Sequence, residues 1–151
     1  MMKKQGLIAG FALAMAFWIS AASGAGPAVG DKAADGTVYA GISPDTHKAL
    51  YATPADAPGV YTLSKGEDYC RALQVSGHLD WHVPSKDELN VLYENRNTGA
   101  LNGTFYETGT PPAGWYWSSS PNAVTAWAQR FSDGLQYYFG RIIDASLRCI
   151  R

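Results

Sequence analysis

Two segments in the middle of the chain repeat apolar residues at the spacing of an amphipathic helix. The clearer segment begins with Ser85 and Glu88, which have the types and spacing of the N-cap and N3 residues of a capping box. Leu89 and Leu92 then recur on one face. This pattern predicts a helix from the box to about Asn95.

An earlier segment has a similar start. Ser64 and Glu67 form a second candidate capping box, which predicts a helix that runs to about Gln74. Gly77 is suited to stop it, because glycine adopts the left-handed conformation that commonly ends helices. The residues expected on its buried face are Tyr69, Cys70, Ala72 and Leu73.

The segments on either side of these helices have the composition of β-strands. Residues 36–42 and 47–53 flank a Ser-Pro-Asp-Thr turn and predict a hairpin. A long irregular segment rich in Gly and Pro follows the second helix at 96–114. The order of elements predicts an α+β domain, with two helices packed on a twisted antiparallel sheet. Further strands are expected at 115–119, 125–131, 135–139 and 146–150, with a hairpin turn at Asp133-Gly134.

The first residues have the pattern of a secretory signal peptide. Lys3 and Lys4 precede an apolar run at 6–19, and small residues follow up to Ala25. We expect cleavage after Ala25, because the apolar run is shorter than the roughly 20 residues that span a bilayer. The alternative is an uncleaved membrane anchor. Cleavage would leave a flexible leader at 26–35 and a domain at 36–151, exported to the periplasm, the outer surface or the exterior.

Charge and cysteine content narrow the possible functions. Without Lys3 and Lys4 the chain carries ten Lys and Arg against thirteen Asp and Glu, a formal charge of −3. This charge gives no basic footprint for nucleic acid, and no segment after the signal peptide is apolar enough to enter a membrane. In an oxidising compartment, Cys70 and Cys149 favour a disulfide. Two free thiols or a metal pair are the alternatives.

Several short motifs occur together in one known family. On these motifs the chain resembles the Lcl C-terminal domain family, named for the C-terminal domain of the Legionella collagen-like protein, over residues 36–151. The resemblance implies a C-type-lectin-like fold, with a disulfide from the first helix to the last strand. His82 and Val83 stand where the family usually has Arg and Leu, so a buried ion pair made by that Arg would be absent here. The motifs are Cys70, Gly77-His78-Leu79-Asp80-Trp81-His82-Val83-Pro84-Ser85-Lys86-Asp87-Glu88-Leu89, Tyr116-Trp117-Ser118-Ser119, Ala126-Trp127, Phe131-Ser132-Asp133-Gly134 and Arg148-Cys149-Ile150-Arg151.

The resemblance also indicates where a ligand would bind. In relatives whose binding face is diversified, this face lies near the strand after the Asp-Gly turn, which makes Gln136, Tyr138 and Arg141 the leading ligand-binding candidates. Trp115 and Tyr116 follow the irregular segment and are expected to be partly exposed, so they are candidates too. The alternative is that these are ordinary solvent-facing strand residues. Trp81 and Trp117 lie inside the motifs and are interpreted as core.

Metal chemistry has weaker support. His78, Asp80 and His82 alternate and could share one side of an extended segment at a spacing that suits zinc. Nothing in the sequence fixes the geometry that such a site requires, and we predict no metal and no cofactor. The Glu-Pro-Asn and Trp-Asn-Asp segments of calcium-dependent lectins do not occur.

Three functions remain open. The leading hypothesis is a non-enzymatic binding module of the cell envelope or exterior, whose partner is a glycan, a sulfated polysaccharide or a protein surface, bound without calcium. The family includes adhesin domains, which favours this hypothesis by analogy. A formylglycine-generating-like enzyme is the second, and it would need a pair of nearby thiols. A structural subunit of an envelope assembly, in which the domain forms an oligomer, is the third.

Overall fold

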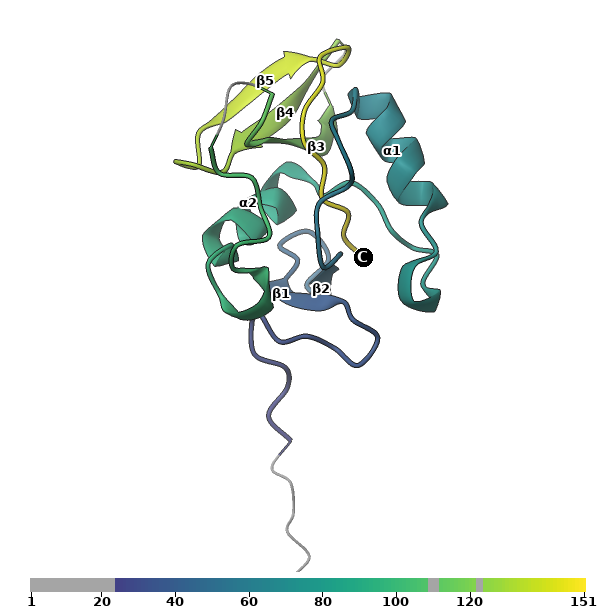
Figure 1. Ribbon diagram of the computed structural model, residues 1–151, viewed down its shortest axis with the longest axis vertical. Coiled ribbons are helices and arrows are strands. Elements are labelled where there is room, and N and C mark those ends of the chain that lie inside the picture. Colours follow the sequence, from purple (N-terminus) through teal and green to yellow (C-terminus); the bar gives the residue numbers. More distant parts are fainter. Residues whose placement is uncertain (1–23, 109–111, 122–123) are drawn as a thin grey trace, which may run out of the picture.

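The computed structural model describes residues 24–108, 112–121 and 124–151, so the predicted signal peptide lies almost wholly outside the described residues. Two α-helices lie between the strands, as the apolar spacing predicts (Figure 1). No helix in the described ranges is long and apolar enough to cross a membrane. The elements are β1 (Val38–Ile42), β2 (Ala49–Ala52), α1 (Leu63–Ala72), the short 3₁₀ helix η1 (Val75–Gly77), α2 (Lys86–Asn95), the 3₁₀ helix η2 (Gly99–Leu101), β3 (Trp115–Pro121), β4 (Thr125–Arg130) and β5 (Gln136–Gly140).

The strands form two antiparallel sheets instead of the single sheet predicted from the sequence. β1 and β2 make a hairpin, and β3, β4 and β5 make a three-stranded meander. The two sheets lie at opposite ends of the domain in Figure 1, with the C-terminal segment running from one to the other. The α+β class is therefore confirmed, while the number of sheets was predicted wrongly.

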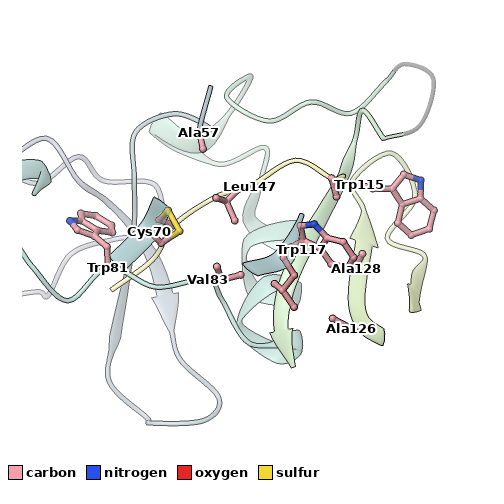
Figure 2. Packing of buried hydrophobic residues seen from close by; sticks show 12 residues of the cluster. Ala57, Cys70, Trp81, Val83, Trp115, Trp117, Ala126, Ala128 and Leu147 are labelled. Carbon is pink, nitrogen blue, oxygen red and sulfur yellow. A yellow bond between two sulfur atoms is a disulfide. The ribbon is translucent and has the colours of Figure 1, made fainter. Parts of the chain in front are cut away.

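The three-stranded sheet lies between the two helices, and successive side chains of β3 point alternately toward α1 and α2. Trp117 faces α1 and packs in a cluster with Leu63 and the disulfide. Figure 2 shows the disulfide beside Leu147. Tyr116, the neighbour of Trp117, faces the other way and packs in a second cluster with residues of α2 such as Leu89. Each face of the sheet thus has its own core.

The last residues of the chain connect both halves of the domain. Ala145 exchanges backbone hydrogen bonds of 2.9 and 3.0 Å with Tyr61, and Ile150 exchanges bonds of 2.9 and 2.8 Å with His82. The predicted strand at 146–150 is wrong as a regular strand. Its backbone is paired, but the partner segment changes every few residues, so only isolated bridges form.

The two predicted capping boxes have different outcomes. The box of Ser85 and Glu88 is confirmed, since the Ser85 hydroxyl accepts from the Glu88 N–H at 3.1 Å and the Glu88 carboxylate accepts from the Ser85 N–H at 3.0 Å. The box of Ser64 and Glu67 is wrong, because the N-cap of α1 is Thr62, two residues earlier, and no side chain caps the helix. The buried Leu63 side chain holds this first turn against the core.

The buried face of α1 is also narrower than predicted. Cys70 is buried and Tyr69 and Leu73 are partly buried, but Ala72 is exposed. The helix ends at Ala72, and Gly77 ends η1 instead.

The predicted disulfide is present. Cys70 of α1 and Cys149 of the C-terminal segment are bonded, with their Cα atoms 5.6 Å apart (Figure 2). The predicted leader at 26–35 packs on the domain from Gly30 onward, where the Gly30 N–H donates to the Tyr39 carbonyl at 2.8 Å. Gly30 contacts η2 so closely that a Cβ atom would lie 2.5 Å from the Thr98 carbonyl oxygen. This part of the leader is therefore not a free tail.

Candidate ligand-binding surface

The leading ligand candidates lie on and just after β5, an edge strand. Gln136 and Tyr138 share the face of the sheet toward α2, and half of the Tyr138 surface is exposed (50%). Arg141 follows the strand, where its N–H donates to the Val124 carbonyl at 3.3 Å. The structure therefore places these three residues along one edge of the molecule.

The prediction that Trp115 and Tyr116 are partly exposed is wrong. Tyr116 has an exposed fraction of 0% and Trp115 only 7%. The Tyr116 ring packs on Phe131 in the core below α2, so it offers no surface to a ligand. Trp115 is covered mostly by Phe139, whose ring lies 4.8 Å away edge to face, but one side of it still reaches a groove. The prediction failed because the side chains of β3 pack into a core on each face of the sheet. The residues that begin this strand are therefore buried.

A small aromatic platform lies on the α2 side of β5. We use this name for Lys86, Trp127 and Tyr138. Trp127 pairs with Tyr138 across the strands, and their rings meet edge to face at 5.2 Å. The Lys86 ammonium lies 4.0 Å from the centre of the Trp127 ring, within range of a cation–π interaction. Such a surface offers both a flat aromatic face and a positive charge.

An apolar groove of about 530 Å³ lies on the opposite side of the sheet. Phe139 of β5 lies at its base beside Trp115, while Ile143 and Val60 are both exposed and line its rim. Asp144 is its only charged lining residue. We call it the β5 groove, and its lining residues are Val60, Pro112, Trp115, Phe139, Ile143 and Asp144.

Exposed apolar side chains are frequent on β5 and in the turns on either side of it. Soluble domains rarely keep such patches without a binding role. Beyond Ile143 and Val60, the exposed large apolar residues in this region are Val124, Leu135, Tyr137, Tyr138 and Ile142.

The family comparison agrees with the motifs. The Lcl C-terminal domain family matches residues 18–151. The chain belongs to this family. No curated protein matches the chain.

In this Lcl C-terminal domain, the motif residues serve the fold. Trp81, Trp117 and Arg148 are all buried, as predicted for the two tryptophans. By contrast, Tyr138 of the aromatic platform and every residue of the β5 groove lie outside the motifs. The motifs thus identify the family, whereas the candidate binding surface, apart from the motif residues Lys86 and Trp127 of the platform, is formed by residues outside them.

A buried polar network joins β3 to the loop before α1 and to the C-terminal segment. Arg148 is fully buried, and its Nε donates to Asp56 Oδ1 at 2.7 Å. The Tyr116 hydroxyl donates to the other Asp56 oxygen at 2.5 Å, and the Arg148 guanidinium also contacts the backbone of Thr104. Burial, together with the charge of Asp56, raises the pKa of Tyr116, so the phenol stays protonated as a donor. Sequence reasoning missed this network because Asp56 lies in a loop without any motif.

The alternating histidines are not brought together. His78 Nε2 lies 2.8 Å from an oxygen of Asp35, while His82 is half exposed with Nδ1 3.1 Å from the Asp80 carbonyl. Within the described residues, no three His, Cys, Asp or Glu side chains are placed to share a metal ion. His82 Nε2 lies 3.9 Å from the buried carboxylate of Glu88, so a loose contact stands where relatives would carry Arg.

Proposed function

We propose that this Lcl C-terminal domain is a non-enzymatic binding module that works outside the cytoplasm, with a C-type-lectin-like fold. Its ligand, a glycan, a sulfated polysaccharide or a protein surface, contacts β5 and the turn that follows. The observation that carries this proposal is the number of exposed apolar side chains on β5 and in its flanking turns, together with the β5 groove. Family membership supports it, since Lcl C-terminal domains resemble extracellular binding modules.

Work outside the cytoplasm has independent support. The Cys70–Cys149 bond links two buried sulfurs, and such structural disulfides persist in oxidising compartments. The amino-terminal pattern of a basic start, an apolar run and small residues agrees with export.

The two faces of β5 suit different parts of a ligand. The aromatic platform offers Trp127 and Tyr138 to a flat apolar face, such as that of a sugar ring, and Lys86 to a negative group. The β5 groove on the other face offers an apolar cavity. A ligand that lies along the β5 edge would reach both.

The formylglycine-generating-like alternative has no comparable support. That chemistry needs two reactive thiols, and in this chain both cysteines form the disulfide. A thiol titration of the folded protein separates the two functions. No reaction agrees with a binding module, whereas two reactive thiols would favour the enzyme.

The binding proposal is tested with surface variants. The purified domain is applied to an array of neutral and sulfated glycans and to a panel of immobilised extracellular proteins. Tyr138→Ala and Arg141→Ala should each weaken the binding that is found by roughly tenfold, as expected for aromatic and Arg residues at the centre of an interface. Tyr106→Ala is the matched control, because Tyr106 is similarly exposed but belongs to the irregular segment after α2 and lines no part of the β5 groove. Equal binding by all three variants would contradict the proposed surface.

A further inference from the structure

The outer edge of β5 carries backbone groups that point away from β4. The Arg130 N–H donates to the Leu135 carbonyl at 2.9 Å. Arg130 and Leu135 are therefore a hydrogen-bonded pair at the start of the ladder between β4 and β5. Since bonded and non-bonded pairs alternate in an antiparallel sheet, the N–H and C=O groups of Gln136 and Tyr138 point outward. Within the described part of the chain, no strand pairs with this edge.

Among the residues that the structure describes, none of the usual features that prevent strand pairing protects this edge. Natural sheets protect their edges with charged residues, proline, bulges or a covering segment. The stretch Leu-Gln-Tyr-Tyr-Phe-Gly at 135–140 contains no charge and no proline. The register of β5 with β4 runs without a bulge. An edge this regular is a template on which another extended chain can add a strand.

The groove beside this edge has a defined chemistry. Five of its lining residues are apolar, and the sixth is Asp144. Asp144 makes no ion pair with any residue that the structure describes. The carboxylate therefore complements a basic group, and the negative formal charge of the chain without Lys3 and Lys4 favours the same partner.

We propose that β5 binds an extended polypeptide segment by strand addition, with a large apolar side chain in the β5 groove and a basic side chain beside Asp144. This inference rests on the proposed function and names the ligand class of the same surface. Because alternate side chains of a strand share one face, the basic residue stands two positions from the apolar one. The main-chain bonds give affinity, and the groove gives specificity.

A second copy of this chain is the less suitable occupant. Two β5 strands could pair antiparallel about Tyr137, with Gln136 opposite Tyr138, but each copy carries the negative formal charge of the chain without Lys3 and Lys4, so two copies repel each other. A foreign segment with a basic side chain is attracted to the same edge.

The test uses the wild-type protein and an array of capped nine-residue peptides. Each peptide alternates Thr or Gln with a central Phe, Leu or Ile, and it carries Arg or Glu two positions to either side. We expect the Arg peptides to bind about threefold more tightly than the matched Glu peptides, as measured by fluorescence anisotropy. The difference is modest because the charge pair with Asp144 is exposed. Asp144→Lys, a substitution at an exposed side chain, should reverse this preference.

Strand addition is tested with two N-methylated isomers of the best peptide. Only alternate amides of an added strand face β5, so one isomer should lose binding by roughly tenfold and the other should keep it. Equal binding by both isomers, or no preference between Arg and Glu peptides, would overturn the inference. If no peptide binds while Tyr138→Ala abolishes glycan binding, the inference fails and the proposed function stands. If neither peptide nor glycan binding depends on Tyr138, both fail.

Discussion

The guanidinium of Arg148 lies against the carboxylate of Asp56, with Nε 2.7 Å from Oδ1, although 92 positions separate the two residues in the sequence. Both side chains are buried, with exposed fractions of 0% and 7%. The Arg148 guanidinium also donates to the Thr53 carbonyl at 2.9 Å and stacks 3.9 Å from the Phe105 ring centre. One cation thereby connects the C-terminal segment, the loop before α1 and the irregular segment after α2.

Removal of Asp56 should therefore be costly. Asp56→Ala leaves the Arg148 charge buried without its partner, and such changes cost about 3–5 kcal/mol of unfolding free energy. We expect this loss in urea denaturation followed by tryptophan fluorescence.

The control is an ion pair on the surface. Asp68 accepts from Arg71 at 2.8 Å, but both side chains are about 70% exposed. Asp68→Ala should cost no more than about 1 kcal/mol. Equal losses for Asp56→Ala and Asp68→Ala would show that the buried pair contributes nothing beyond its surface counterpart.

The capping boxes show how far local sequence predicts structure. Ser85 and Ser64 each precede a Glu by three residues, yet only Ser85 caps a helix. Glu88 is held by a further contact, because the Ser43 hydroxyl donates to its carboxylate at 2.6 Å. The second box has no such partner, and burial of Leu63 sets the helix start instead. Local patterns predict an element, whereas tertiary packing decides where it begins.

This difference gives a paired prediction. Ser85→Ala removes a side-chain acceptor at the N-terminus of α2 and should lower the unfolding free energy by about 1 kcal/mol. Ser64→Ala removes an exposed hydroxyl that caps nothing, so it should change stability by less than about 0.5 kcal/mol. Thermal and urea denaturation of the two variants check this. A loss of stability for Ser64→Ala equal to that for Ser85→Ala would contradict the finding that Ser64 caps no helix.

The candidate site was predicted only in part. Tyr138 and Arg141 follow an Asp-Gly turn, which is a local signal, and in the structure Tyr138 lies on β5 and Arg141 just after it. The β5 groove could not be predicted, because Val60, Pro112 and Ile143 come from three distant segments that meet only in the fold. The C-terminal segment brings them together, and its isolated bridges leave no periodic pattern to read.

The disulfide should contribute strongly to stability. It joins residues 79 positions apart, and closure of such a loop in the unfolded chain contributes about 4–5 kcal/mol in the chain-entropy description. We expect the urea midpoint to fall sharply for the Cys70→Ser, Cys149→Ser double variant, with little change in the urea dependence of the folded baseline. Reductant should lower the midpoint of the wild type and leave the double variant unchanged. A wild type that is insensitive to reductant after full denaturation and refolding would contradict this role.

Acid should weaken the hairpin between β4 and β5. The Arg130 guanidinium and the Leu135 N–H both donate to Asp133, and they lower the pKa of this carboxyl from 3.8 to about 2. Asp133 thus binds a proton more weakly in the folded chain than in the unfolded chain. Its contribution to stability is complete above pH 4 and is lost as the pH falls toward 2. Hydrogen bonds from Thr37 and His78 likewise hold the pKa of Asp35 below its usual range, so the wild type should lose stability across this window.

Asp133→Asn distinguishes the contribution of Asp133 to acid stability from that of Asp35. The amide cannot titrate, so urea midpoints measured from pH 4 to pH 2 should fall less steeply for this variant than for the wild type, with the remaining slope left to Asp35 and other carboxylates. Arg130→Gln should flatten the same part of the curve, because it removes the hydrogen-bond donor that lowers the pKa of Asp133 most. A wild-type slope in both variants would mean that the Arg130–Asp133 contact, although formed in the fold, has no part in acid stability.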